Sequence, residues 1–308
     1  MIHKIELVLF PEEADDEMRH LFSASQFLSI DMKRIKAIRI LKRSIDARAQ
    51  QVKIRLTADV YVDENPPIQK NIQEIFSFHK NVSTASPVLI AGFGPAGMFA
   101  ALRLIELGLK PVIIERGKNV KQRRRDLAAI NKQGILNPDS NYCFGEGGAG
   151  TYSDGKLYTR SNKRGDITRI LDILILHGAE EDIRINAHPH IGTNKLPKII
   201  ETIRETILKA GGEIFFNTRL TDLITEKNIL KGIITTDTIS GEEKRINCNT
   251  VLLATGHSSR DIYELLDKKN IFIEAKSFAL GLRIEHPQEI IDKRGDCCAG
   301  WRFGLCAF

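Results

Sequence analysis

The sequence has few cysteines and no long apolar run, and both absences exclude classes of protein. Its 308 residues include five cysteines, and none are spaced as C-x-x-C. The sequence therefore indicates neither a zinc site nor a thioredoxin-type redox pair. It also has no run of about 18 apolar residues that could cross a membrane. Because residues 1–7 lack the apolar core of a signal peptide, we expect a cytoplasmic protein without membrane contact.

The charge balance is basic, but it does not favour nucleic-acid binding. The formal net charge is +6, and residues 31–55 contain nine Lys or Arg against two Asp. These charges alternate with apolar residues, as they do on the solvated faces of amphipathic elements. The basic run Arg123–Arg125 is too short to form an interaction tail. Nucleic acid is therefore the less favoured partner, and a small-molecule substrate is the preferred one.

The length and the local patterns predict more than one domain. Residues 1–82 read as a small α+β domain, and the polar stretch 81–87 reads as a linker. Residues 87–265 form the second predicted domain, and residues 266–308 the start of a third. In the first domain we expect strands at 5–10, 37–42 and 52–62 and helices at 15–27 and 68–78.

The most informative stretch is Val88-Leu-Ile-Ala-Gly-Phe-Gly-Pro-Ala-Gly-Met98, followed by a second apolar strand that ends at Glu115. This layout predicts a dinucleotide-binding strand-turn-helix-strand unit. Gly92 would allow the tight turn, Gly94 the close approach of backbone N–H groups to a pyrophosphate, and Gly97 close packing of the helix. A carboxylate at Glu115 suits a ribose 2′-hydroxyl and would repel a 2′-phosphate, so FAD or NAD fits better than NADP.

A dense glycine cluster lies at residues 144–156, with glycines at 145, 147, 148, 150 and 155. Such a loop lets backbone amides face an anion or a flat ring at contact distance. The alternative is a purely structural turn followed by an Asp-Gly hairpin.

The rest of the second domain completes the pattern of a nucleotide-binding fold. Helices are expected at 166–176 and 196–209, a parallel strand at 213–216, and a three-stranded meander at 220–226, 230–237 and 243–248. Residues 250–254 read as a strand that returns to the main sheet and ends at Thr255-Gly256. The predicted fold class is α/β, a Rossmann-like domain with a parallel sheet and a β-meander, preceded by the small α+β domain.

Several of these segments resemble those of a known family. They are Gly92–Gly97, Phe144–Leu157, His190–Leu196, and Ala254–Asp261 together with Gly281–Pro287. The chain resembles the glutathione-reductase-type FAD domains, and more closely the bacterial uncharacterised FAD-dependent dehydrogenases, or NAD(P)/FAD-dependent oxidoreductases, over residues 1 to about 292. The resemblance implies an FAD-dependent oxidoreductase, with NAD(P)H as a candidate reductant.

The resemblance also implies which residues hold the cofactor. The pyrophosphate would lie at the 92–97 turn, the adenosine ribose at Glu115, and the adenine at the backbone of Leu220, with Arg123 as a phosphate or ribose partner. The complete candidate set is Gly92, Gly94, Pro95, Ala96, Gly97, Glu115, Arg116, Arg123, Gly147, Gly148, Ala149, Gly150, Ser153, Asp154, Gly155, Lys156, Leu220, Thr255 and Gly256. The sequence identifies no catalytic acid or base. It predicts no metal site, since His188 and His190 have no nearby Cys or acidic partner.

The C-terminal end departs from the family. Family members continue further, whereas the tail 293–308 does not resemble them. We therefore expect a truncated substrate domain and a flavin site that lacks one wall. Two alternatives to an oxidoreductase stay open: an inactive or truncated FAD-binding remnant, and a flavin-dependent protein that binds or modifies RNA. The sequence does not indicate the oligomeric state.

Overall fold

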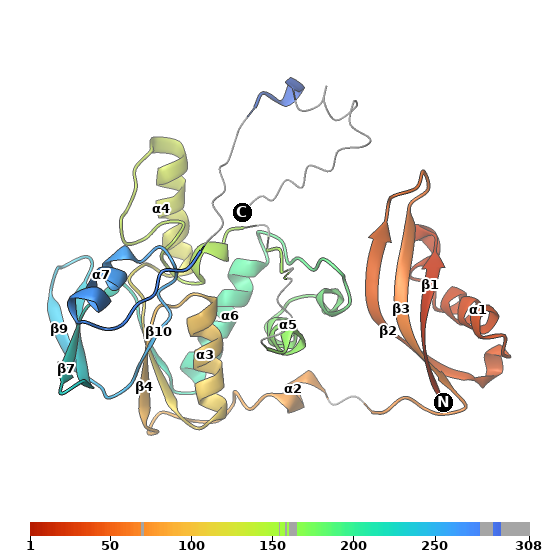
Figure 1. The fold of residues 1–308 in the computed structure, drawn as a ribbon, viewed down its shortest axis with the longest axis horizontal. Helices are drawn as coiled ribbons and strands as arrows, with labels where there is room; N and C mark the ends of the chain where they lie inside the picture. Colours follow the sequence, from red (N-terminus) through yellow and green to blue (C-terminus); the bar gives the residue numbers. More distant parts are fainter. Residues whose placement is uncertain (69–70, 154, 158, 160–164, 278–285, 291–308) are drawn as a thin grey trace. The chain divides into compact units, whose positions relative to one another are not determined.

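The fold is α/β, as the sequence predicts, with a parallel sheet and two antiparallel sheets. The computed structural model describes residues 1–68, 71–153, 155–157, 159, 165–277 and 286–290 (Figure 1). The chain divides into two compact units, Met1–Ile262 and Tyr263–Phe308. The cavity described below lies entirely in the first unit.

The N-terminal module is a three-stranded antiparallel sheet with a helix on one face (Figure 1). The strands are β1 (Ile2–Leu9), β2 (Ile35–Asp46) and β3 (Lys53–Val62), in the order β1-β3-β2, and the helix is α1 (Glu17–Leu28). Alternate residues of β1 are buried against the helix, which is the pattern of a sheet with one solvent-exposed face. The module also contains two short 3-10 helices, η1 (Pro11–Glu13) and η2 (Met32–Arg34).

The second part of the chain is built on a parallel sheet of order β10-β4-β5-β6. Its strands are β4 (Pro87–Ala91), β5 (Lys110–Ile114), β6 (Glu213–Phe215) and β10 (Val251–Leu253). Helices α3 (Pro95–Glu106) and α6 (Leu196–Lys209) cover one face (Figure 1). Their apolar sides meet the sheet in a core that is separate from the core of the N-terminal module.

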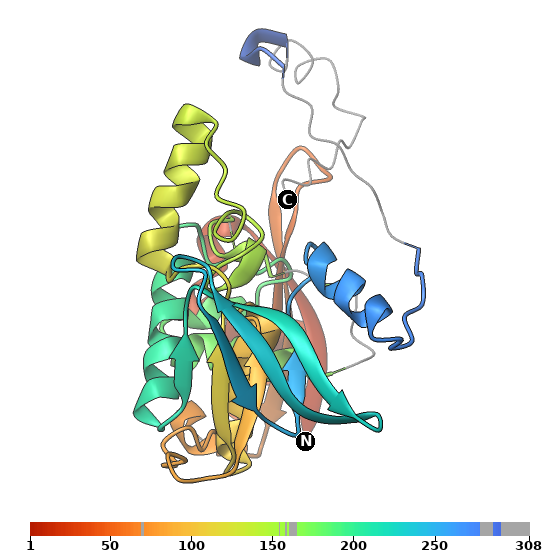
Figure 2. The same ribbon diagram turned by 90° about the vertical axis from the view of Figure 1, so that its left-hand side faces the viewer.

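An antiparallel meander lies toward the other face of this sheet (Figure 2). It consists of β7 (Thr218–Glu226), β8 (Ile229–Asp237) and β9 (Glu243–Asn247). The remaining elements are α4 (Val120–Gln133), η3 (Gly148–Gly150), α5 (Ile167–Leu176), η4 (Glu181–Arg184) and α7 (Arg260–Lys268). None of the helices in the described ranges combines the length and the apolar character needed to span a bilayer.

One predicted helix is wrong in extent. The sequence predicts a helix over 68–78, but the structure forms only the single turn α2 (Ile72–Ile75). Phe76 has extended backbone angles, and both Phe76 and Phe78 are buried with their rings stacked at 5.1 Å. Two core residues at i and i+2 require an extended chain, because a helix would point them to different sides.

Candidate functional site

A cavity of about 450 Å³ lies at the carboxyl ends of three parallel strands. Ala91, Ile114 and Leu253, the last residues of β4, β5 and β10, all line it. The strand order reverses direction at β4, and ligands of open α/β sheets bind at such a switch point. The other walls come from the turn before α3, the glycine cluster, the start of β7 and the segment 254–262.

The turn between β4 and α3 requires glycine at two positions. Gly92 has a φ of +107°, and a Cβ there would lie 2.3 Å from the Ala254 oxygen. A Cβ on Gly97 would lie 2.0 Å from the Gly92 oxygen. The sequence assigns a tight turn and close helix packing to these two glycines, and the backbone geometry confirms both roles.

Gly94 differs, because the protein itself does not require a glycine there. A Cβ at Gly94 would make only an ordinary contact, 3.6 Å from the nearest protein atom. Gly94 is the N-cap of α3, and no side chain caps the free amides of the first turn. Pro95 and Ala96 line the cavity beside it. This combination leaves an uncapped helix N-terminus facing the cavity, which is a favourable position for a phosphate group.

Glu115 joins three loops around the cavity. Its side chain is buried, with the residue 5% exposed, and it accepts hydrogen bonds from the backbone N–H groups of Phe93 at 2.7 Å, Gly117 at 2.8 Å and Gly145 at 3.0 Å. A carboxylate offers about four acceptor positions, so roughly one is left for a ligand hydroxyl. Glu115 lines the cavity, but most of its hydrogen-bonding capacity holds the walls together.

Arg123 does not line the cavity, in contrast to the role that the resemblance implies. The residue is 1% exposed and lies inside the glycine loop. Its guanidinium donates to the backbone oxygens of residues 141, 142, 145, 146 and 148 and to the Thr151 hydroxyl. Burial lowers the pKa of Arg123, although a guanidinium stays charged at neutral pH. The side chain thus shapes the loop from within, because each of its three nitrogens donates to a protein atom of the loop.

A buried ion pair beneath the loop was missed by sequence reasoning. Glu146 is fully buried, accepts from the Val120 backbone N–H at 2.7 Å, and pairs with Arg204 of α6 at 2.6 Å. Burial raises the pKa of Glu146 to about 7, against the opposing effects of the Val120 N–H and Arg204. The only sequence signal was a glutamate within a glycine cluster, and its partner lies 58 positions away.

The structure brings together twelve of the predicted cofactor residues and separates the others. Those that line the cavity are Gly92, Gly94, Pro95, Ala96, Glu115, Arg116, Gly148, Ala149, Gly150, Leu220, Thr255 and Gly256. Gly97, Arg123, Gly147, Ser153, Gly155 and Lys156 are not among the lining residues. Ser153 instead donates to the Gly150 oxygen, and Lys156 forms a β-bridge with His190. Asp154 lies outside the described residues.

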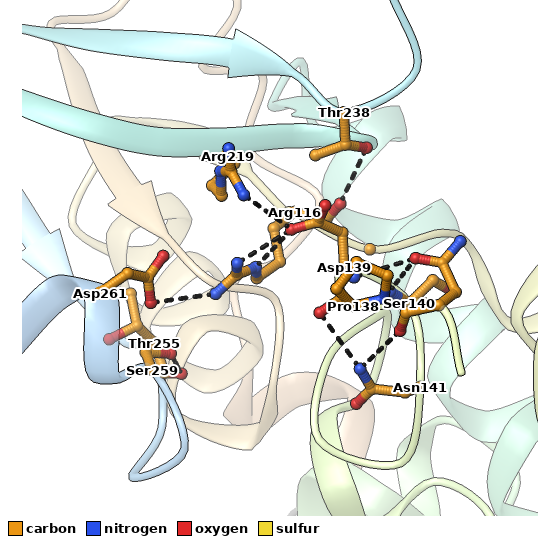
Figure 3. Close-up of polar contacts among 12 residues, drawn as sticks. Arg116, Pro138, Asp139, Ser140, Asn141, Arg219, Thr238, Thr255, Ser259 and Asp261 are labelled. Carbon is orange, nitrogen blue, oxygen red and sulfur yellow. Dashed lines mark hydrogen bonds and ion pairs between the residues drawn. The ribbon is translucent and has the colours of Figure 1, made fainter. Parts of the chain in front are cut away.

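An ion-pair network lies on the wall of the cavity (Figure 3). The Arg116 guanidinium contacts Asp139 at 2.9 Å and Asp261 at 3.2 Å, and it lies 4.1 Å from the ring centre of Phe144. Arg219 of β7 contacts the same Asp139 oxygen at 3.3 Å. Phe144, Arg219 and Asp261 also line the cavity, although the sequence analysis named none of them as candidates.

The residues fit the adenosine and pyrophosphate portion of a dinucleotide better than they fit a catalytic centre. The lining offers uncapped amides, bare glycines and two arginines. In the described part of the chain, no three His, Cys, Asp or Glu side chains cluster as a metal site would require. His257 is the only histidine among the lining residues. The cavity therefore has the chemistry of a binding site.

Comparisons with known proteins cover the chain unevenly. A family model described as a domain of unknown function, DUF8436, matches residues 1–61, which contain nearly all of the N-terminal module. An uncharacterised protein of Clostridium beijerinckii is 40% identical over 278 residues, which cover 86% of this chain and 51% of that protein. The chain thus spans about half the length of this relative.

Two further proteins show more distant likenesses to this chain. Thiamine thiazole synthase of Aeropyrum pernix is 24% identical over 226 residues, or 70% of each protein. The crystal structure of THI4 from Thermovibrio ammonificans matches with a TM-score of 0.41 and 17% identity, and the match covers 61% of this chain and 64% of that one.

Proposed function

We propose that this chain binds FAD in the cavity at the ends of β4, β5 and β10 and forms the nucleotide-binding part of a flavin-dependent oxidoreductase. One observation carries the proposal: an uncapped helix N-terminus and a glycine that the protein packing does not require face the same cavity at the switch point of a parallel sheet. The family resemblance stated above supports FAD in particular, and NAD(P)H is the proposed reductant.

In this proposal the chain's own residues bind and orient the cofactor. The first-turn amides of α3 and the backbone at Gly94 would hold the pyrophosphate, and the remaining acceptor position of Glu115 would take a ribose hydroxyl. The wall formed by Leu220 and the segment 254–259 would exclude water from the adenosine side. When bound, the flavin supplies the hydride chemistry.

The substitution Gly94→Val tests the proposal at a cavity glycine where an added Cβ makes only an ordinary van der Waals contact with the protein. The Gly94 backbone is extended, with φ −81° and ψ −171°, so valine is compatible with it. Its methyl groups would occupy the space assigned to the pyrophosphate. We expect the affinity for FAD to fall at least about tenfold, because hydrogen bonds to a charged group are lost. The thermal midpoint without ligand should change little.

The readout is a titration of FAD fluorescence with purified protein, followed by bleaching of the bound flavin with dithionite. Wild-type protein that folds and yet fails to retain FAD would overturn the proposal and favour a remnant without cofactor. Equal FAD affinity in the wild type and Gly94→Val would show that the cofactor lies elsewhere.

A further inference from the structure

We propose that Arg116, Asp139 and Asp261 form a charge clamp that positions the cavity walls for the adenosine portion of the nucleotide. The inference rests on the proposed function, and it assigns a role to two aspartates that the sequence analysis left without one. Arg116 acts in it as a positioning residue.

Three separate segments of the chain supply the charges of the clamp. Arg116 follows β5, Asp139 lies in the loop after α4, and Asp261 lies in the first turn of α7. The pair Arg116–Asp261 joins positions 145 apart in sequence, on two walls of one cavity (Figure 3). A single guanidinium can hold both carboxylates because its donors point in fixed, separate directions.

The loop that carries Asp139 is itself held by hydrogen bonds. The Asn137 side chain accepts from the backbone N–H groups of Asp139 at 2.9 Å and Ser140 at 3.1 Å. The Asn141 side-chain amide donates to the backbone carbonyl oxygen of Asn137 at 2.8 Å. A site is pre-organised when its polar groups are fixed by a supporting layer of hydrogen bonds, and this loop has such a layer.

The clamp is a balanced set of charges whose members differ in exposure. Arg116 and Arg219 together balance Asp139 and Asp261, so the cluster carries no net charge. Arg116 is 16% exposed at its side chain and Asp139 equally so, whereas Asp261 is 43% exposed. The Arg116–Asp139 pair is therefore the more buried part of the clamp. Asp261 connects the wall formed by the segment 254–262 to this pair. The same wall is tied internally by the Ser259 hydroxyl, which donates to the Thr255 oxygen at 2.5 Å.

The Phe144 ring completes the clamp. The Arg116 guanidinium lies 4.1 Å from the centre of this ring, and a cation–π contact of this kind helps to hold the arginine in place. Fixing a side chain before ligand arrives removes an ordering cost from binding, and each such side chain is worth about twofold to tenfold in affinity.

A double-mutant cycle measured by calorimetry with ADP as the probe tests the clamp. Arg116→Gln and Asp261→Asn should each weaken ADP binding, by about threefold to tenfold, and the double variant should bind no more weakly than Arg116→Gln alone. Arg116→Lys should fall between the wild type and Arg116→Gln, since an ammonium lacks the fork that bridges two carboxylates. Asp63→Asn is the matched control, because it breaks an ion pair with Arg34 in the N-terminal module.

The outcomes separate this inference from the proposed function. Unliganded thermal midpoints within about 2 °C of the wild type, together with the non-additive ADP affinities, would support a positioning role. Additive losses in the double variant, or an unchanged ADP affinity in Arg116→Gln, would overturn the clamp and leave the nucleotide site intact. Wild-type protein that binds neither ADP nor FAD would overturn the proposed function itself.

Discussion

Replacing the buried Arg123 tests whether the glycine loop is held from within. In Arg123→Met, five backbone oxygens between residues 141 and 148 lose a charged donor. A hydrogen bond to a charged group contributes about 1.5–3 kcal/mol, and a buried acceptor left unpaired costs a similar amount. Because water can enter a loop and replace part of these bonds, we take two bonds as the net loss. The expected decrease in the free energy of unfolding is therefore about 3–6 kcal/mol.

The assay is urea unfolding followed by circular dichroism, with the exposed neighbour Arg124→Met as the control. Arg124 lies on the same helix, so its replacement removes the same charge from the surface and should change stability by less than about 0.5 kcal/mol. The reasoning fails if Arg123→Met is as stable as the control. If Arg123→Met keeps its stability but loses FAD affinity, the result would instead support the direct cofactor contact that the family resemblance implies.

Two further predictions concern the same loops. The raised pKa of Glu146 means that the folded state holds a proton which the unfolded state releases, so stability should fall as the pH rises from about 4.5 to 7, by at most about 3 kcal/mol. Denaturation across this pH range should show a flatter profile for Glu146→Gln, and an identical slope in both proteins would contradict the assignment. Gly97→Ala should destabilise the chain by about 1–3 kcal/mol because its Cβ would meet the Gly92 oxygen at 2.0 Å, whereas Gly94→Ala, with 3.6 Å of space, should not. Equal melting midpoints for these two alanine variants would refute the packing argument.

The regular elements could be predicted from the sequence where one periodicity holds throughout. The helix predicted over 196–209 matches α6 at both ends, because its apolar residues recur at helical spacing and Gly211 follows its end. The prediction for β2 was too short, at 37–42 rather than Ile35–Asp46. Its pairing with β3 shifts register between Ile35 and Ala37 and again between Ile40 and Lys42. Such irregularities interrupt the alternation on which strand prediction depends.

The residues of the candidate site could also be predicted only in part. Glycines that a turn requires could be recognised because the reason for them is local, as at Gly92. The orientation of long polar side chains could not be predicted, because it depends on groups distant in sequence. Arg123 was assigned to the ligand and instead binds the loop, and the pair of Glu146 with Arg204 had no local signal. The roles of charged residues near a glycine-rich turn can therefore be assigned only when their tertiary contacts are known.

The position of β10 has a consequence for synthesis on the ribosome. This strand pairs directly with β4, yet it ends at Leu253, whereas the N-terminal sheet is complete at Val62. Roughly 160 residues separate the end of β4 at Ala91 from Leu253, and they take ~8–32 s to translate. During that interval one edge of β4 has no neighbour, and the wall that carries Thr255 does not yet exist. The cavity at the ends of β4, β5 and β10 is therefore completed only late in elongation.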